Sequence, residues 1–288
     1  MRRVVALLAL GVSTPASAHG GHEHGIGWTF DASVTVPLLL AAALYGLGLW
    51  RLHARSGRGR PGLARRARLY ALGWLTLAGA LVSPLHEAGE RSFTFHMIEH
   101  ELLMLPAALL LVAARPGPVL LWGLPRLLRQ SVGAVARLSL WHRLSEPITA
   151  TGIQALIIWL WHMPGPFDLA LRHEGWHVVQ HLCFVFGALL FWWAMLHRTS
   201  EALAAVCLFA TSMIGGALGA LMALSTSPWY SAYSAMGMTP FGLSPEQDQQ
   251  LAGLIMWIPG GLFHLGAALW FLGRWLSGKG GRDAYPAK

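Results

Sequence analysis

Long apolar runs separated by polar connections dominate this chain from end to end. Each run is about 17–25 residues long, which is what a helix needs to cross the hydrocarbon core of a bilayer. Lipid offers no water to satisfy backbone N–H and C=O groups, so such runs are predicted to be helices. We expect seven spans, at residues 34–52, 68–84, 93–114, 147–163, 176–197, 203–224 and 249–273.

The composition supports the same fold class. Hydrophobic residues make up 55% of the chain and charged residues only 12%, whereas a soluble globular domain carries about 25% charged residues. Cys183 and Cys207 both lie in apolar runs and form no C-x-x-C motif, so neither a disulfide scaffold nor a thiolate metal motif is indicated. The sequence therefore predicts an all-α, polytopic helical membrane protein.

A shorter apolar run at the start of the chain is typical of a secretory signal peptide. Arg2 and Arg3 precede an apolar core at residues 4–12, and Ala16-Ser17-Ala18 supplies the small residues of a cleavage site. The core is too short to span a membrane. We expect a signal peptide at 1–18, a His-rich outer stub at 19–33, the seven-helix membrane domain at 34–275 and a basic cytoplasmic tail at 276–288.

Basic residues collect in alternate connections. Seven Arg lie in residues 51–68 and five in residues 115–147, whereas the opposite side of the predicted spans has only Arg91 and Arg172. Because cytoplasmic loops carry the excess of Lys and Arg, we expect a multi-pass inner (plasma) membrane protein with its mature N-terminus outside and its C-terminus inside. The net charge of +8 then reflects topology and contact with anionic membrane lipid, and no nucleic-acid partner is expected.

Two histidine pairs carry the clearest chemical signal. His96 and His100 lie near the outer start of the third predicted span, and His177 and His181 near the outer start of the fifth. A spacing of four residues places both rings of a pair on one face of a helix. Both spans run inward from outside, so if the two helices are neighbours the pairs lie at similar depth and could converge. Such histidines could instead hydrogen-bond lipid headgroups or neighbouring helices.

Neighbouring side chains could complete a metal site. His162 and Met163 lie at the outer end of the fourth span; imidazole suits copper and zinc, and a thioether selects Cu(I). Glu99 lies deep enough to need a partner, and the ring N–H of a metal-bound histidine is a common one. We therefore predict Glu99 as the hydrogen-bond partner of a ligand, and copper ligands among His96, His100, His162, Met163, His177 and His181.

Cleavage after Ala18 would expose a second group of metal-binding residues. The mature N-terminus would begin His19-Gly20-Gly21-His22-Glu23-His24. Its free α-amine and the imidazoles of His19, His22 and His24 resemble a copper-capture tail on a flexible tether. The same residues could equally form an incidental His-rich stub.

Two other chemistries use similar residues. One histidine from each of two helices can ligate haem axially, which would suit a membrane electron carrier. The run His96-Met97-Ile98-Glu99-His100 also matches the H-x-x-E-H spelling of an inverted zinc-peptidase site. A haem-binding electron carrier and a membrane metallopeptidase are therefore alternatives to a copper-handling protein.

Proline interrupts two of the predicted spans. Pro106 lies in the third span, and Ile258-Pro259-Gly260-Gly261 lies in the last span near His264. Because proline removes a backbone donor, each position predicts a hinge or a packing kink. In the sixth span, Gly215 and Gly219 have the spacing of a close helix contact.

The segment from Ser244 to Gly261 resembles the closing span of the caa-type cytochrome c oxidase assembly factor family (CtaG-like). Support comes from the run His96–His100, from Trp161-His162-Met163-Pro164 and from the His177/His181 pair, and the resemblance covers roughly residues 30–275. It implies a seven-span, non-enzymatic protein needed to build an active respiratory oxidase, commonly thought to act in copper supply to the catalytic subunit. An unrelated single-span copper chaperone shares the family label, and its paired-cysteine motif is absent from this sequence.

These patterns together predict a cytochrome c oxidase assembly factor that supplies or inserts copper from the outer face of the membrane, as a metallochaperone. Copper is the expected bound metal. The resemblance implies cytochrome c oxidase subunits as partners, and periplasmic copper donors are further candidate partners.

Overall fold

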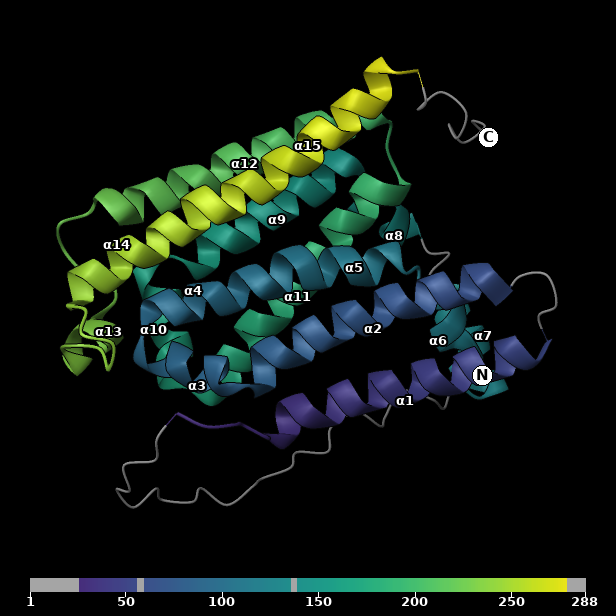
Figure 1. Ribbon diagram of the computed structural model, residues 1–288, viewed down its shortest axis with the longest axis horizontal. Helices are drawn as coiled ribbons and strands as arrows, with labels where there is room; N and C mark the ends of the chain where they lie inside the picture. The colour runs from purple at the N-terminus through teal and green to yellow at the C-terminus, as the bar shows by residue number, and fades with distance from the viewer. Residues whose placement is uncertain (1–25, 56–59, 136–138, 279–288) are drawn as a thin grey trace, which may run out of the picture.

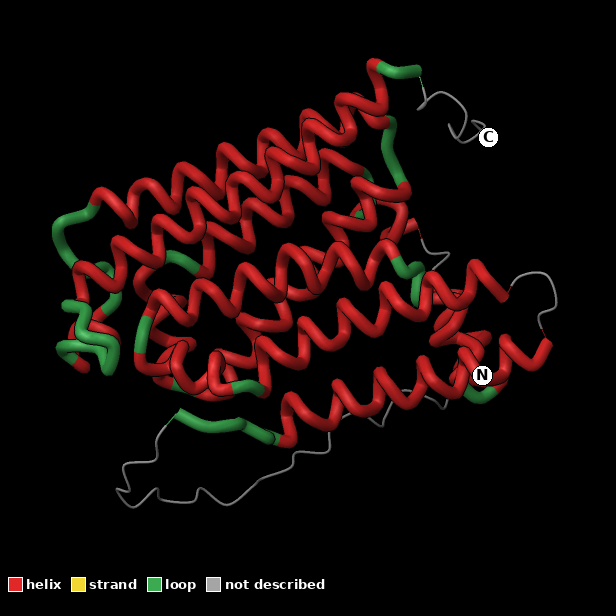
Figure 2. Tube along the Cα trace, in the orientation of Figure 1, coloured by secondary structure: helices red, strands yellow, loops and turns green. Residues whose placement is uncertain are grey.

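The computed structural model describes residues 26–55, 60–135 and 139–278, and the regular structure in these residues is helical throughout (Figure 2). A helix forms at every one of the apolar runs, so the all-α fold class is confirmed. The predicted signal peptide and the candidate capture residues His19, His22 and His24 lie outside the described residues.

The first half of the described chain contains two long helices, a short helix that follows a bend, one span with an internal π-helical segment, and three further short helices. In order these are α1 (Ala32–Arg55), α2 (Arg60–Val82), α3 (Pro84–Arg91), α4 (Phe93–Leu102), η1 (Leu103–Ala107), α5 (Ala108–Ala113), α6 (Gly117–Gly123), α7 (Arg126–Val135) and α8 (Ser139–Leu144). The bend between α2 and α3 measures 45°.

The second half adds three single helices, two short ones and a last span with an internal π-helical segment. In order these are α9 (Pro147–Trp161), α10 (Pro164–Arg172), α11 (Glu174–His197), α12 (Glu201–Leu224), α13 (Ser231–Met236), α14 (Pro245–Ile255), η2 (Met256–Gly260) and α15 (Gly261–Leu276). The last predicted span is one continuous helical path of 32 residues from α14 to α15.

Five helices in the described residues are long and apolar enough to cross a membrane, and α2 joined to α3 makes up to six. The predicted number of seven spans is therefore not confirmed. The first nine residues of α2 include Arg60, Arg65, Arg66 and Arg68, which lower its apolar character. Helix α9 has 15 residues, a length of about 22 Å, whereas the hydrocarbon core is about 30 Å thick.

The long helices run side by side along the longest axis of the molecule (Figure 1). Helices α3, α10 and α13 gather at one end, which we call the histidine end, and α6, α7 and α8 gather at the other, which we call the basic end. At the basic end Arg55 and Arg129 lie over the Trp122 ring, 4.9 and 4.4 Å from its centre. The arginine-rich connections thus share one end of the bundle, as the charge pattern predicts; the side of the membrane that this end faces stays a prediction.

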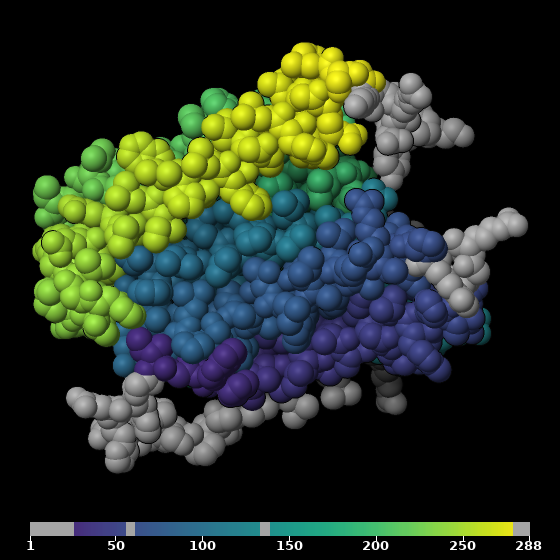
Figure 3. Space-filling view, in the orientation of Figure 1, coloured from purple at the N-terminus to yellow at the C-terminus, as the bar shows by residue number. Residues whose placement is uncertain are grey.

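Apolar side chains cover much of the outer surface. Helices α1 and α15 lie along opposite edges of the body (Figure 3), and both expose large apolar side chains, among them Trp50 at 69% and Trp270 at 54%. Water disfavours such surfaces and lipid does not. The bundle is therefore covered as a membrane-embedded protein would be.

Both prolines predicted to form a hinge or a packing kink lie in π-helical segments, Pro106 in η1 and Pro259 in η2. A π turn widens the helix by one residue per hydrogen-bonded ring. The helical path continues through each proline, so neither span is broken.

Helices α12 and α14 touch backbone to backbone at Gly219 and Gly253. A Cβ added at Gly219 would lie 2.7 Å from the Gly253 carbonyl oxygen, and one added at Gly253 would lie 2.5 Å from the Gly219 oxygen. The predicted close packing at Gly219 is confirmed, whereas an added Cβ at Gly215 meets nothing within 4 Å. This contact sets where α14 lies against the rest of the bundle.

Candidate functional site

The two predicted histidine pairs converge at the histidine end. Within the pairs, the ring centres of His96 and His100 are 4.2 Å apart and those of His177 and His181 are 4.3 Å apart. Between the pairs, His96 lies 5.5 Å from His177, and His100 lies 5.2 Å from His181. The equal spacing of four residues on α4 and α11 therefore places four imidazoles in one group.

A fifth histidine, His86 of α3, joins this group. Its ring stacks on His177 at 5.6 Å and meets His181 edge-on at 6.0 Å. Ser83 caps α3 by accepting a hydrogen bond from the backbone N–H of Leu85, and Pro84 occupies the first turn, where its missing N–H costs nothing. We call His86, His96, His100, His177 and His181 the histidine cluster.

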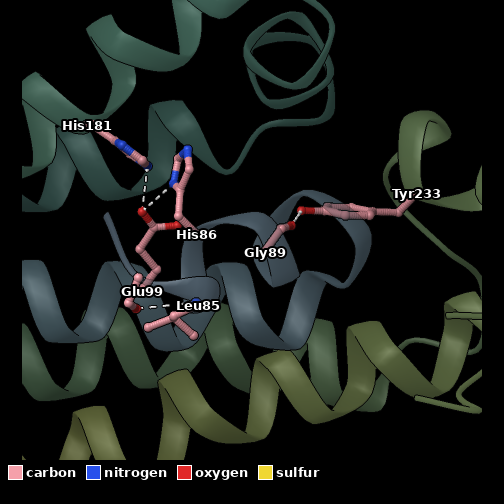
Figure 4. A network of polar contacts seen from close by, with 7 residues as sticks. Leu85, His86, Gly89, Glu99, His181 and Tyr233 are labelled. Carbon is pink, nitrogen blue, oxygen red and sulfur yellow. Dashed lines mark hydrogen bonds and ion pairs between the residues drawn. The ribbon is translucent and has the colours of Figure 1, made fainter. Parts of the chain in front are cut away.

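Glu99 is fully buried among these rings (Figure 4). Its Oε1 lies 2.8 Å from His86 Nδ1 and 4.0 Å from His181 Nε2. A carboxylate in this position fixes the tautomer and orientation of an imidazole. An added Cβ at Gly89 would lie 3.4 Å from Glu99 Oε2, so a glycine on α3 leaves space for the carboxyl group.

The two predicted ligands at the end of the fourth predicted span, His162 and Met163, lie outside the histidine cluster. His162 is buried and its Nδ1 donates to the Ile158 carbonyl oxygen at 2.7 Å. Its ring contacts Phe167 and Phe184, which in turn contact His96 and His100. The Met163 side chain is 54% exposed, so it faces away from the buried rings.

The cluster has unusual free hydrogen-bonding capacity. Five buried ring nitrogens of the cluster have no hydrogen-bond partner in the described residues, namely Nε2 of His96, His177 and His181 and both nitrogens of His100, and Nε2 of the neighbouring His162 has none either. Most buried polar atoms in proteins are paired, because an unpaired one costs about 1–3 kcal/mol. Free imidazole nitrogens at this density are the donors that a copper or zinc ion uses.

The present side-chain arrangement is not that of a closed metal site. Within the described residues, no group of three or more His, Cys, Asp or Glu side chains has metal-binding geometry. Several rings meet edge to face, as His100 and His181 do at 86°. The donor types fit copper, and the rings must rotate for their free nitrogens to point at one ion.

Asp248 of α14 positions the helix that carries His96, Glu99 and His100. Its carboxylate accepts hydrogen bonds from Ser92 Oγ at 2.7 Å and from the backbone N–H groups of Phe93 and Thr94 at 2.6 and 3.1 Å. These are N–H groups of the first turn, which have no partner within the helix. An aspartate from another helix therefore caps α4.

Tyr233 of α13 holds α3 in place. It is buried, and its hydroxyl donates to the Gly89 carbonyl oxygen at 2.6 Å (Figure 4). His86, Asp248 and Tyr233 are not among the site residues predicted from the sequence. His86 lies on the predicted outer side, and Asp248 is an acid at the start of an apolar span; both were available signals.

Comparisons with known proteins agree with the resemblance seen in the sequence. A family model described as the cytochrome c oxidase caa3 assembly factor (Caa3_CtaG) matches residues 43–278. Two relatives, proteins described as uncharacterized from Mycobacterium bovis and Mycobacterium tuberculosis, are each 28% identical over 248 residues, covering 80% of this chain and 36% of the relative. This chain therefore spans about a third of the length of those relatives.

No solved structure matches this chain. The family match covers most of the sequence, and it includes both histidine pairs, Glu99 and Asp248. The chain belongs to the cytochrome c oxidase caa3 assembly factor family.

Proposed function

We propose that this assembly factor handles copper, and that the histidine cluster is where the ion binds on its way to the oxidase. The observation that carries the proposal is the convergence of five imidazoles with buried ring nitrogens left unpaired. Nothing in the ordinary packing of a membrane helix calls for this, because unpaired polar groups in the membrane are costly and usually functional.

The surroundings of the cluster suit an ion that must be bound and then released. Glu99 places a carboxyl group beside the rings and holds His86 through Oε1. His177 is half-buried, whereas the other four rings of the histidine cluster are buried. An ion reaching His177 from the outer surface would enter the cluster without crossing the apolar core.

The position of the cluster supports delivery from the outer face. The histidine end lies opposite the basic end (Figure 1), and basic connections are retained in the cytoplasm. Reporter fusions after Arg60 and after Ala235 test this orientation. The first is expected to report the cytoplasm and the second the outside; the same side for both would remove this support.

Metal analysis of the purified full-length protein tests the proposal itself. Wild-type protein loaded with Cu(I) is expected to retain copper, whereas His100→Ala and His181→Ala lose it from the cluster and fail to support oxidase assembly in cells. His142→Ala is the matched control, because His142 is exposed on α8 at the basic end. Full copper retention and full oxidase assembly in both cluster variants would refute the proposal.

The same preparation separates the alternative chemistries. A Soret band in the optical spectrum of the purified protein would identify a haem carrier, and copper without that band supports the assembly role. A peptidase would show a hydrolytic activity that Glu99→Gln removes while the metal stays bound.

A further inference from the structure

A second buried polar site lies between α4, α9, α12 and α15, outside the histidine cluster. There a small, partly open cavity of about 20 Å³ has room for one water-sized sphere or a small ion. Its wall includes Glu101, Met104, Gln154, Met256, Gly260 and His264. These residues come from five elements, α4, η1, α9, η2 and α15, so the cavity lies where the two π-helical spans meet α9.

Glu101 is the only acidic residue in the wall of this cavity. Its Oε2 is buried and has no hydrogen-bond partner in the described residues. The Oε1 atom of Gln154, a side chain that is 2% exposed, is also buried and unpaired. Two unpaired oxygen acceptors at membrane depth call for a donor or a cation.

The backbone makes room for the carboxyl group at one place. An added Cβ at Gly260 would lie 2.6 Å from Glu101 Oε2 and 2.9 Å from its carboxyl carbon. Gly260 ends η2, the π-helical segment that contains Pro259. The glycine at the end of η2 therefore lets the Glu101 side chain, which comes from the span that contains η1, lie directly against the backbone of the span that contains η2.

The remaining groups in the wall define the chemistry. Glu101 and Met104 are three residues apart, which places them on the same face of their helix, and Met256 approaches from η2. Thioethers select Cu(I) over harder ions. Cu(I) also carries a single positive charge, which one carboxylate neutralises, and a neutral pair is far cheaper than a net charge in a low-dielectric interior.

We propose that this cavity is a second copper site, in which the Glu101 carboxylate and the Met104 and Met256 thioethers bind one Cu(I) ion. The inference rests on the proposed copper-handling function and extends it: Met104 lies four residues beyond His100, about 6 Å further along the helix. An ion leaving the imidazoles would reach sulfur ligands deeper in the bundle. Gln154 Nε2, 3.9 Å from Met104 Sδ, would move aside as the thioether takes up copper.

The test uses the full-length protein in detergent, loaded with Cu(I) without oxygen and freed of excess metal. Copper per chain is counted, and X-ray absorption at the copper edge shows whether sulfur is bound. Wild-type protein is expected to show sulfur ligation. The double variant Met104→Leu/Met256→Leu should lose sulfur ligation and one copper per chain, and Glu101→Gln should weaken that copper at least tenfold. Leucine conserves volume and apolar character, so these variants should fold.

Met213→Leu is the matched control, because Met213 lies on α12 beside the cavity residues Thr211 and Ser212 but is itself 52% exposed. It should leave copper and sulfur ligation unchanged. Gly260→Ala should act like Glu101→Gln, since its Cβ occupies the place of the carboxyl oxygen. Unchanged sulfur ligation in the double methionine variant, or no sulfur ligation in the wild type, overturns the second site.

The two copper proposals fail separately. If His100→Ala loses nitrogen-bound copper while the methionine variants change nothing, the histidine cluster stands and the cavity site falls. If the methionine variants lose copper while His100→Ala and His181→Ala keep all of theirs, the cavity stands and the histidine cluster falls. A wild-type chain that binds no Cu(I) overturns both.

Discussion

Glu99 and Glu101 lie two residues apart on one helix and face different surroundings. Glu99 pairs with His86 at 2.8 Å and lies within the histidine cluster. Glu101 has an unpaired oxygen against Gly260, in a cavity lined by thioethers. Each residue turns a helix by about 100°, so side chains two apart point to nearly opposite faces. One helix thereby supplies a carboxylate to each of two buried polar sites.

The partner of each carboxylate, rather than the carboxylate itself, determines what that residue can do. Beside imidazoles, Glu99 can orient a ring and offset the charge of an ion that the rings hold. Beside sulfur, Glu101 would bind the Cu(I) ion directly and offset its charge, because the thioethers have no N–H to orient. The two sites should therefore respond differently to the same substitution.

Asp248→Ala is expected to have the largest effect, because Asp248 fixes the start of the helix that serves both sites. Its loss would leave Ser92 Oγ and the N–H groups of Phe93 and Thr94 buried without an acceptor. Each unpaired donor costs about 1–3 kcal/mol, so we expect the free energy of unfolding to fall by about 3 kcal/mol or more. Reversible unfolding in mixed micelles measures it.

Asp248→Asn is the control for this prediction. Asparagine keeps the size and one acceptor oxygen, so it should lose less stability than alanine. If Asp248→Ala is as stable as the wild type, Asp248 does not hold α4 in place, and the link between α14 and the histidine cluster fails.

Glu99→Gln compared with Glu101→Gln tests the two carboxylates directly. Removing a hydrogen-bond partner of a metal-binding histidine typically costs about 10–100-fold in metal affinity, or about 1.4–2.7 kcal/mol. We expect Glu99→Gln to lower the copper affinity of the histidine cluster by this amount and Glu101→Gln to leave that affinity unchanged. Competition against a chromophoric Cu(I) chelator, read alongside nitrogen and sulfur ligation, gives both values. Equal effects of the two substitutions at the cluster would contradict separate roles.

His86→Ala is expected to lower the copper affinity of the cluster about tenfold, the lower end of the range for loss of a hydrogen bond beside a metal site. The substitution leaves the buried Glu99 carboxylate with only the more distant His181, 4.0 Å away. His86→Gln keeps an N–H that can reach Glu99 and should retain part of the affinity. Chelator competition for the two variants measures this, and no difference between them would show that the bond to Glu99 has no effect on copper.

The sequence predicted the helices and the pairing of histidines because both depend on local spacing. Apolar length gave the helical spans, and the four-residue spacing gave rings on one face of α4 and of α11. The convergence of the two pairs also needed the two helices to be neighbours that run in the same direction. The helices and the shared ring faces are therefore determined by short stretches of the chain.

The parts that the sequence did not predict depend on contacts between distant residues. Asp248 caps a helix that begins more than 150 positions earlier, and Gly260 makes room for a carboxylate on another span. His86 lies on a short helix whose place is set by the 45° bend after α2. The predicted seven spans are not confirmed for a different reason: arginines on α2 and the shortness of α9 place both helices near the limit of what crosses a bilayer.

Tyr233→Phe is expected to have the smallest effect, and it tests how far the support of Glu99 extends. The hydroxyl donates to the Gly89 carbonyl oxygen at 2.6 Å, and Gly89 borders Glu99 Oε2. Losing one neutral hydrogen bond should lower the free energy of unfolding by about 1 kcal/mol. Because α3 would remain capped by Ser83, copper affinity at the cluster should fall less than for Glu99→Gln.

Tyr230→Phe is the matched control, since its hydroxyl donates to the His162 carbonyl oxygen at 2.9 Å, and the His162 ring contacts Phe167 and Phe184. It should cost similar stability and leave cluster copper unchanged. If the two tyrosine variants weaken copper equally, the effect comes from general loosening of the histidine end and not from the line of contacts that runs from Tyr233 through Gly89 to Glu99.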